Sequence, residues 1–418
     1  MEQREKAILV GVNINHQPNF EYSMEELRNL TDACEIEVVG EITQNLQRVN
    51  KSHYVGTGKI EEIHALKEMV SADVVIFNDE LSPSQIRNLE ADLDCKVIDR
   101  TILILDIFAE RAKTKEAQLQ VEVAQLQYML PRLIGLRESL GRQGGGSGLK
   151  NRGAGETKLE LDRRKIEEKI VALNKELEIL VAHRKTQRKQ RKKNNVPVVA
   201  LVGYTNAGKS TIMNAMVEKF HPLENKQVFE KDMLFATLET SVRNISLPDH
   251  KSFLLTDTVG FVSKLPHHLV KAFRSTLEEV AEADLLIHVV DFSNSSYQEH
   301  IEITNQTLKD IGIENIPTIY AYNKSDLMDI QIPRMNNEEV YLSAKQRVGI
   351  DELIQLIRKG IFKDYIHCEM LIPYDQGRII SYFNEHANVL GTSYEETGTK
   401  LILECKLSDF EKHQEYVV

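Results

Sequence analysis

The chain has 418 residues, of which 42% are hydrophobic and 28% are charged, and its net charge is −11. Single cores stop growing at roughly 250 to 300 residues, so this length predicts three or four folded units. No apolar run reaches the roughly 18 residues of a membrane span, and residues 1–10 lack the pattern of a secretory signal, so we expect a cytoplasmic protein without a membrane span.

The charge is distributed unevenly along the chain. Residues 111–193 contain 21 Lys and Arg but only 10 Asp and Glu, which is a local charge of +11 within an acidic protein. Nucleic acid repels an acidic surface, whereas a basic segment neutralises phosphates. We therefore expect one segment that is suited to RNA, and no DNA partner. Separately from the charge, the chain is expected to be a monomer.

The first part of the chain, residues 1–108, alternates short apolar runs with helical stretches. Strand-like runs occur at 7–12, 74–77 and 96–98, and helix-like stretches at 59–70 and 83–93. This alternation predicts a small N-terminal α/β domain.

Residues 109–194 change to a helical period. Two apolar seams repeat with spacings of 4, 3, 4 and 3 residues, so we predict an antiparallel helical hairpin, although Pro131 should kink or end the first helix. The seams consist of Leu119, Val123, Leu126, Leu130 and Leu133, and of Ile166, Ile170, Leu173, Leu177 and Leu180.

A glycine-rich stretch, residues 141–155, separates the two predicted helices. Seven of its fifteen residues are glycine, so it cannot pack a core, and a flexible linker is one interpretation. Its cations Arg142, Lys150 and Arg152 are also suited to an RNA backbone, which makes them candidate ribosome contacts.

The next region, residues 195–363, contains a phosphate-binding loop. An apolar run at 198–202 leads into Gly203-Tyr-Thr-Asn-Ala-Gly-Lys-Ser210, and a helical pattern follows at 211–217. The glycines let backbone N–H groups wrap a phosphate, Lys209 neutralises its oxygens, and the Ser210 hydroxyl coordinates Mg²⁺. We therefore predict a P-loop G domain with a doubly wound, mostly parallel sheet.

A second motif indicates which base is bound. The apolar run at 316–322 ends in Asn323-Lys-Ser-Asp326, about 115 residues after the P-loop. The Asp326 carboxylate can accept two hydrogen bonds from guanine, and adenine offers no such pair of donors. This argues for GTP and against an RNA-remodelling ATPase.

Further motifs follow in the expected order. Asp257 begins Asp-Thr-Val-Gly260 and should hold magnesium through water, while Gly260 is placed to contact the γ-phosphate. Ser343-Ala-Lys345 would lie against the guanine ring. Thr237 is the favoured switch threonine, and Thr240 is the competing candidate.

The site residues fall into three classes. We predict Lys209, Thr237 and Gly260 as catalytic residues, and Ser210, Thr237 and Asp257 as residues of the metal site. The nucleotide-binding residues are Gly203, Tyr204, Thr205, Asn206, Ala207, Gly208, Lys209, Ser210 and Thr211; Phe235, Ala236, Thr237, Leu238 and Glu239; Asp257, Thr258, Val259 and Gly260; Asn323, Lys324, Ser325 and Asp326; and Ser343, Ala344 and Lys345.

Two residues bear on the rate of hydrolysis. Phe261 stands where Ras-like proteins have the glutamine that orients the attacking water, so intrinsic hydrolysis should be slow. Asn206 stands where some related GTPases hold a potassium ion, which gives the hypothesis that K⁺ accelerates hydrolysis. The alternative is that Asn206 serves only the loop conformation.

These motifs, together with Val55-Gly-Thr-Gly-Lys-Ile60, Leu81-Ser-Pro-Ser-Gln85 and Arg152-Gly-Ala-Gly-Glu-Thr157, closely resemble the HflX family of translational GTPases. The resemblance implies that the hairpin binds rRNA of the large (50S) ribosomal subunit and that GTP controls this attachment. It also implies splitting or rescue of stalled 70S ribosomes, a stress response. ATP binding by the N-terminal region is a further implication, but Gly56-Thr-Gly-Lys59 is too short for a P-loop, which favours an ordinary strand-to-helix turn.

The last residues, 364–418, suggest a small α+β domain. Strand-like stretches at 368–372 and 400–407 flank a helix-like stretch at 376–386, as in a βαβ unit. An alternative function is a regulatory switch that recruits proteins through residues 1–108 or 364–418 and does not act on ribosomes.

Overall fold

The computed structural model describes residues 4–17, 19–143, 152–193, 196–220, 235, 241–264 and 280–418, and it leaves the side chains of 133–143, 152–160 and 183–193 undescribed. The chain divides into two compact units. The first consists of Met1–Gln190, Lys231–Glu239 and Val259–Leu277, and the second of Arg191–Glu230, Thr240–Thr258 and Glu278–Val418.

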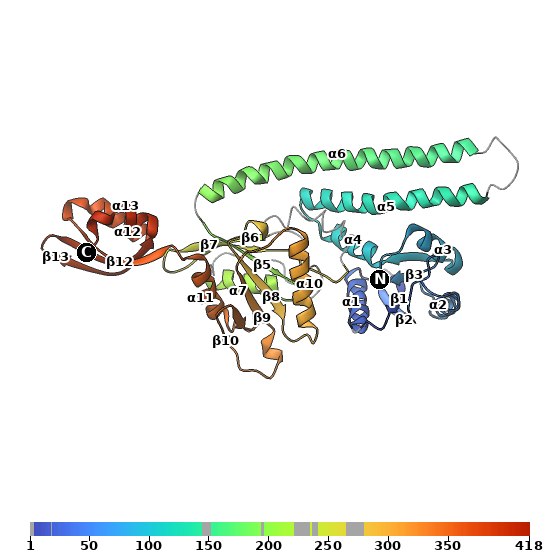
Figure 1. The fold of residues 1–418 in the computed structure, drawn as a ribbon, viewed down its shortest axis with the longest axis horizontal. Helices are drawn as coiled ribbons and strands as arrows, with labels where there is room; N and C mark the ends of the chain where they lie inside the picture. The colour runs from blue at the N-terminus through green and yellow to red at the C-terminus, as the bar shows by residue number, and fades with distance from the viewer. Residues whose placement is uncertain are drawn as a thin grey trace. The chain divides into compact units, whose positions relative to one another are not determined.

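The first unit contains a four-stranded parallel sheet in the order β2-β1-β3-β4 (Figure 1). The strands expected at 7–12, 74–77 and 96–98 and the helices expected at 59–70 and 83–93 are confirmed. The elements are β1 (Lys6–Ile14), α1 (Phe20–Ala33), β2 (Glu37–Leu46), α2 (Thr57–Val70), β3 (Val74–Phe77), α3 (Pro83–Leu93), β4 (Lys96–Asp99) and α4 (Arg100–Arg111).

The same unit contains the predicted hairpin of α5 (Lys115–Gln143) and α6 (Arg152–Lys193). Lys115 pairs with Glu176 at 3.4 Å, and Glu122 pairs with Lys169 at 2.6 Å. The partner numbers decrease along α6 as they increase along α5, so the two helices are antiparallel, and they lie side by side in Figure 1.

The structure decides one alternative for this hairpin and corrects the bounds of its tip. A kink or an end of the helix was expected at Pro131, and the end is excluded because α5 continues to Gln143. Arg132, directly after the proline, donates to the Leu81 carbonyl at 3.3 Å and pairs with Asp99 at 3.4 Å, and Tyr128 also bonds to Asp99. These tertiary contacts hold the helix on both sides of the proline. The glycine-rich tip is shorter than 141–155, because residues 141–143 and 152–155 are helical.

The second unit contains a seven-stranded sheet in the order β10-β11-β9-β8-β5-β7-β6. Its five inner strands are parallel, and its edge strands β10 and β6 are antiparallel, which confirms the predicted doubly wound sheet. The elements are β5 (Val198–Gly203), α7 (Lys209–Phe220), β6 (Ser241–Ser246), β7 (Ser252–Asp257), β8 (Leu285–Asp291), α10 (Tyr297–Asp310), β9 (Thr318–Asn323), η1 (Ser325–Leu327), β10 (Arg334–Met335), β11 (Glu339–Tyr341) and α11 (Ile350–Ile361).

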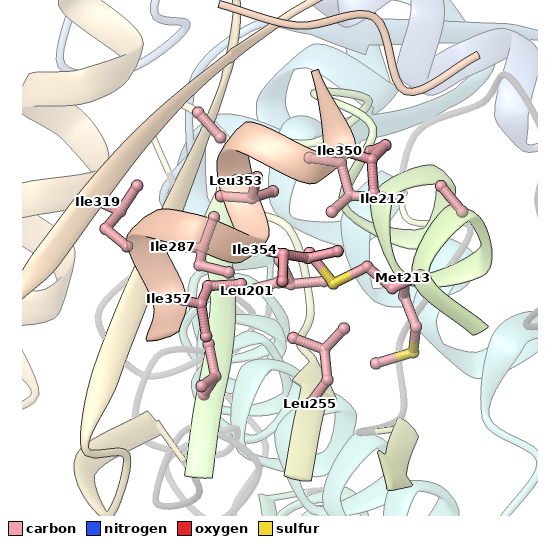
Figure 2. Close-up of a cluster of buried hydrophobic side chains, with 14 of the residues drawn as sticks. Leu201, Ile212, Met213, Leu255, Ile287, Ile319, Ile350, Leu353, Ile354 and Ile357 are labelled. Carbon is pink, nitrogen blue, oxygen red and sulfur yellow. The ribbon is translucent and has the colours of Figure 1, made fainter. Parts of the chain in front are cut away.

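Helices α7 and α11 cover one face of this sheet. Figure 2 shows side chains of both helices meeting those of the central strands in one buried cluster. Burial of this face holds the central strands in place. The predicted nucleotide motifs lie at the carboxyl ends of these strands. The labelled residues are Leu201, Ile212, Met213, Leu255, Ile287, Ile319, Ile350, Leu353, Ile354 and Ile357.

The C-terminal part of this unit is an antiparallel sheet in the order β12-β14-β13. The sequence missed β13, and a register shift between Val389 and Gly391 explains why, since it interrupts the period-two pattern. The expected βαβ unit is therefore a small α+β arrangement. Its elements are β12 (Tyr365–Ile372), η2 (Tyr374–Gln376), α12 (Gly377–His386), β13 (Asn388–Glu395), β14 (Gly398–Lys406), α13 (Leu407–Lys412) and η3 (Gln414–Tyr416).

Among the helices in the described parts of the chain, none is long and apolar enough to cross a membrane.

Candidate nucleotide-binding site

The loop between β5 and α7 has a backbone that only glycine permits at two positions. Gly203 has φ +144°, and a Cβ there would lie 2.2 Å from the Val289 carbonyl oxygen. Gly208 has φ +95°, and a Cβ there would lie 2.2 Å from Nδ2 of Asn323. The loop therefore passes close to both β8 and β9, and its shape is fixed by neighbours on either side.

Lys209, the first residue of α7, is buried in this loop. Its Nζ donates to the carbonyl oxygens of Gly203 at 3.1 Å and of Tyr204 at 2.8 Å. Burial lowers the pKa of Lys209 to about 8, and the negative charge of Asp257 opposes this shift. The ammonium is thus held among backbone dipoles, where an anionic phosphate would favour its charged form.

His288 of β8 is a buried neighbour of this lysine that the sequence reasoning missed. Burial, and secondarily the charge of Lys209, lower the pKa of His288 to about 3. The imidazole is therefore neutral at physiological pH. A single histidine within an apolar strand gave no signal by which it could have been singled out.

Ser210 and Asp257 bring two oxygen ligands together. Asp257 ends β7, and Ser210 Oγ donates to its Oδ2 at 2.7 Å. Thr258 Oγ1 donates to the Leu201 carbonyl at 2.6 Å and fixes the end of β7 against β5. A hydroxyl and a carboxylate at the start of a helix can hold a hard cation beside a bound phosphate.

Asn323 connects the P-loop to the two segments predicted to contact the base. Its Nδ2 donates to the Ala207 carbonyl at 2.9 Å, and its Oδ1 accepts from the Ala344 N–H at 2.9 Å. Asp326 Oδ2 accepts from Gln346 Nε2 at 3.1 Å. The P-loop, residues 323–326 and residues 343–345 are therefore joined by hydrogen bonds, as their order along the chain predicted.

Two charged residues near the base-contacting segments were not predicted. Asp291, at the end of β8, pairs with Lys324 at 2.7 Å, and its position at a strand end could have identified it. Arg347 donates to the Ala344 carbonyl at 2.6 Å and pairs with Glu218 of α7 at 2.7 Å. Nothing in the sequence distinguishes Arg347 from other surface arginines.

Several predicted residues fall outside the second unit or outside the described residues. Val259 and Gly260 belong to the first unit, as does Phe235, whose ring meets Phe108 edge to face at 4.7 Å. Arg142 and Arg152 lie in α5 and α6, and their side chains are undescribed. Ala236, Thr237, Leu238, Glu239, Thr240 and Lys150 lie outside the described residues.

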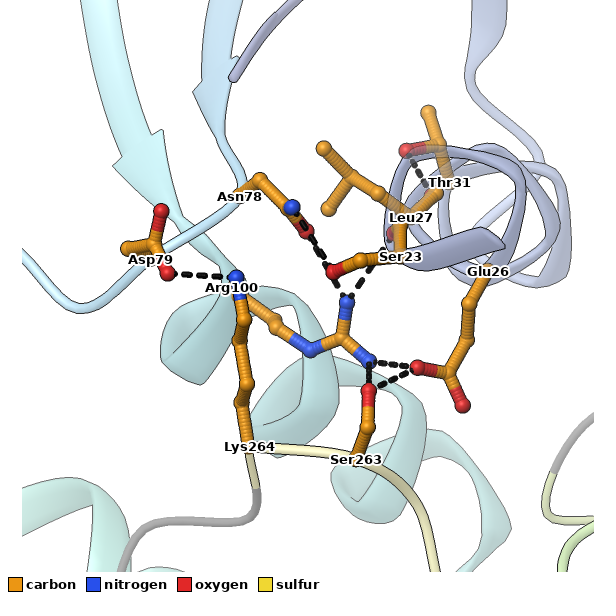
Figure 3. A network of polar contacts seen from close by, with 9 residues as sticks. All are labelled: Ser23, Glu26, Leu27, Thr31, Asn78, Asp79, Arg100, Ser263 and Lys264. Atoms are coloured by element: carbon orange, nitrogen blue, oxygen red, sulfur yellow. Dashed lines mark hydrogen bonds and ion pairs between the residues drawn. The ribbon is translucent and has the colours of Figure 1, made fainter. Parts of the chain in front are cut away.

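The segment that follows Gly260 is bonded to the N-terminal part of the first unit (Figure 3). Ser263 Oγ accepts from Arg100 Nη2 at 3.0 Å and donates to the Glu26 carboxylate. Arg100 is 1% exposed, pairs with Glu26 and donates to Asn78 Oδ1 at 3.0 Å. Ser263 thus completes a buried ion-pair network at the start of α4.

A second ion pair holds the next residue. Lys264 Nζ lies 2.6 Å from Asp79 Oδ1, directly after β3 (Figure 3). Residues 259–264 continue directly from β7, which carries Asp257, so the chain runs without interruption from the predicted magnesium site to these N-terminal contacts.

Three family models together match most of the chain. They are described as GTP-binding GTPase N-terminal (residues 21–109), GTP-binding GTPase Middle Region (residues 111–191) and 50S ribosome-binding GTPase (residues 198–324).

The chain is also similar to known proteins. The GTPase HflX of Caldanaerobacter subterraneus subsp. tengcongensis is 46% identical over 99% of this chain and 94% of its own length. The GTPase HflX of Escherichia coli K12 is 40% identical over 94% of this chain and 92% of its own length. A crystal structure of a GTP-binding protein from Sulfolobus solfataricus with GDP aligns at 22% identity and a TM-score of 0.44, over 86% of this chain and 99% of that one. On the strength of the full-length relatives, this chain belongs to the HflX family of GTPases.

Proposed function

We propose that this GTPase is a monomeric cytoplasmic factor that binds rRNA of the large ribosomal subunit through the α5–α6 hairpin and splits stalled 70S ribosomes under GTP control. GTP hydrolysis follows from membership of the family. The observation that carries the proposed control is the bonding of Ser263 to Arg100, because α4 begins at Arg100 and leads into the hairpin.

The proposed nucleotide site is the P-loop with residues 257–258, 323–326 and 343–345. Lys209 neutralises β- and γ-phosphate oxygens, and the loop N–H groups surround the phosphates. Asp326 accepts the two guanine donors. The hydrogen bonds of Asn323 to Ala207 and Ala344 support this assignment, because they hold the phosphate-binding and base-binding segments in one frame.

Magnesium fits the donors near the P-loop. Ser210 Oγ and the Asp257 carboxylate are adjacent, and Mg²⁺ prefers oxygen ligands. Ser210 would be a direct ligand, Asp257 would act through water, and Thr237 is the third proposed ligand. When bound, the ion neutralises charge on the phosphate oxygens.

Hydrolysis is proposed to be slow without a partner. Phe261 is 2% exposed and has no polar group with which to orient a water molecule. Asn206 has φ +60°, which fits a loop-conformation residue, and it also remains the proposed potassium ligand. Turnover in matched KCl and NaCl tests the potassium role, and equal rates would remove it.

The GTP-dependent control is proposed to act through residues 259–264. In related switches, loss of the γ-phosphate releases the segment that follows the Asp-x-x-Gly motif. Here that segment is bonded to the buried Arg100–Glu26 pair and to Asp79. A change in this segment would therefore be felt at the start of α4 and passed to the hairpin.

Co-sedimentation with 70S ribosomes and separated subunits, in GDP, GTP and a non-hydrolysable analogue, tests the proposal. We expect analogue-dependent binding to the large subunit together with loss of 70S particles. Absence of binding to any particle would remove the ribosomal role and favour a protein-recruiting switch.

The proposed contacts at the hairpin tip are tested by changing Arg142, Lys150 and Arg152 to Ala. Affinity for the large subunit should fall. The slope of log affinity against log salt concentration should become shallower by the equivalent of up to about three phosphate contacts. A matched control replaces the exposed Lys363, Arg378 and Lys412 of the C-terminal part. Equal losses in both variants would show a general charge effect and contradict the assignment of the tip.

A further inference from the structure

Tyr204, the second residue of the P-loop, is held by a ring from outside the loop. Its ring lies parallel to the imidazole of His300 on α10, with centroids 3.9 Å apart and planes at 5°. Each residue is only 4% exposed. The stack therefore anchors the first turn of the loop to α10.

Holding this ring constrains the backbone that shapes the loop. The Tyr204 carbonyl accepts from Lys209 Nζ at 2.8 Å and from the Ala207 N–H at 3.4 Å. Gly203, directly before it, is already confined by the Val289 carbonyl. The held ring and the confined preceding residue limit the movement of the Tyr204 backbone, whose carbonyl is one of the two acceptors of the lysine ammonium.

The segment that leads into α10 also contacts the base-binding side. The Phe292 N–H donates to the Asn323 carbonyl at 2.9 Å, and Asp291 pairs with Lys324 at 2.7 Å. His300 lies on α10, the helix into which this segment leads. Thus one segment, residues 291–300, contacts the Asn323–Asp326 motif at its start and the P-loop at its end.

We propose that His300 is a positioning residue for GTP binding: its stack on Tyr204 holds the P-loop in the phosphate-binding shape, and it does not touch the nucleotide. This inference rests on the proposed nucleotide site. The loop must keep its shape for both GDP and GTP, so loss of the stack should weaken the two nucleotides equally. A loss of uniform binding raises KM and leaves kcat unchanged.

Three variants of the full chain separate this role from general packing. His300→Ala removes the stack, and His300→Phe keeps a flat ring of similar size. Leu308→Ala is the matched control, because Leu308 is buried in the same helix about 12 Å further along its axis. Dissociation constants for fluorescent GDP and a fluorescent GTP analogue, melting temperatures and GTPase kinetics are measured for each.

We expect His300→Ala to weaken both nucleotides by about three- to tenfold, with unchanged kcat, as befits a lost aromatic pair. His300→Phe should restore affinity to within about twofold. Leu308→Ala should lower the melting temperature at least as much as His300→Ala and leave both dissociation constants unchanged.

The proposal is overturned if His300→Ala binds nucleotide no worse than Leu308→Ala, or if His300→Phe is as weak as His300→Ala. A fourth variant, Lys209→Ala, distinguishes failure of the proposed role of the stack from failure of the proposed nucleotide site. If Lys209→Ala abolishes binding while His300→Ala binds normally, the nucleotide site stands and only the role of the stack fails. If Lys209→Ala binds normally, the site itself is wrong.

Discussion

Two regions of this chain have a glycine-rich turn that ends in lysine and begins a helix. Before α2, Gly56 is the N-cap with φ −70°, and a Cβ on Gly58 would meet nothing within 4 Å. Lys59 pairs with Glu62 on the surface of that helix. Before α7, both Gly203 and Gly208 have positive φ and touch neighbouring strands.

The difference shows what a phosphate-binding loop requires beyond its composition. In the second turn the backbone is forced into a conformation that only glycine adopts, and the Lys209 ammonium is turned inward onto loop carbonyls. In the first turn neither glycine has a positive φ, and a Cβ on Gly56 would meet only the Gln44 side chain, at 3.1 Å from its Nε2. The lysine side chain there pairs with Glu62 of its own helix. The first turn therefore supports an ordinary helix start, and ATP binding there finds no support in its geometry.

The largest effect should come from Lys209, and its counterpart Lys59 should show none. Lys209→Ala should raise the dissociation constants for GDP and GTP by more than about 100-fold, because a charge-assisted contact to phosphate is lost. Lys59→Ala should leave them unchanged. Titration with fluorescent nucleotides measures both, and equal losses in the two variants would break the comparison.

The two turns should also differ because only the second, the P-loop, is joined to a segment that contacts the guanine base, residues 323–326. Asp326→Asn should relax the preference for GTP over ATP by roughly 10- to 1000-fold, because one oxygen acceptor becomes a donor. Gln346→Ala is the control, since it removes a hydrogen-bond partner of Asp326 and keeps the carboxylate. An unchanged GTP preference in Asp326→Asn would refute the assignment of the base site.

The paired glycines give a sharper comparison of the two turns. Gly208→Ala should destabilise the protein by about 2 to 4 kcal/mol, because φ +95° is strained for alanine and its Cβ would clash with Asn323. Gly58→Ala should stabilise it by about 0.5 to 1 kcal/mol, because Gly58 lies in α2 with open space around it. Urea unfolding measures both, and a common sign would contradict the distinction.

The smallest effect concerns pH. Burial lowers the pKa of Lys209 to about 8 in the free protein, and phosphate binding needs the protonated ammonium. Nucleotide binding should therefore take up a proton above pH 8, so that affinity falls by up to about tenfold per pH unit there and stays level from pH 7 to 7.5. Fluorescent GDP titrations between pH 7 and 9 test this, and a constant affinity would show that Lys209 keeps its ordinary pKa.

The same pKa shift affects the stability of the free protein in the opposite direction: affinity for nucleotide falls as pH rises, whereas the free energy of unfolding rises. Between pH 8 and about 10.5 an unfolded chain holds the Lys209 proton more tightly than the folded chain does. The contribution of Lys209 to the free energy of unfolding therefore rises with pH in this window. Lys209→Met should remove that part of the pH dependence.

Much of this architecture was predictable because its signals are local. Strand periodicity, the spacing of glycines before Lys209 and the polar residues after each strand gave the sheet and the nucleotide motifs. The length of α5 was not predictable, since contacts of Arg132 and Tyr128 with Asp99, distant in sequence, carry the helix past Pro131. Strand β13 was missed because a bulge interrupts its alternation.

The parts of the candidate site that were missed depend on distant pairings. His300 and Tyr204 are almost 100 residues apart, and neither has a neighbour in sequence that suggests a stack. The Ser263–Arg100 bond joins residues 163 positions apart. Side chains of this kind are assigned a role only once the fold has brought them together.

We propose that residues 259–264 carry the nucleotide state to Arg100, Glu26 and Asp79 of the first unit. The most direct measurement compares the affinity for isolated large subunits in the GTP analogue and in GDP, for the unaltered chain and for Ser263→Ala with Lys264→Ala. We predict a ratio of at least about tenfold for the unaltered chain, within the usual range of coupling between two sites, and a ratio near one for the double variant, whose nucleotide affinity should be unchanged. A double variant that keeps the full ratio would contradict the account.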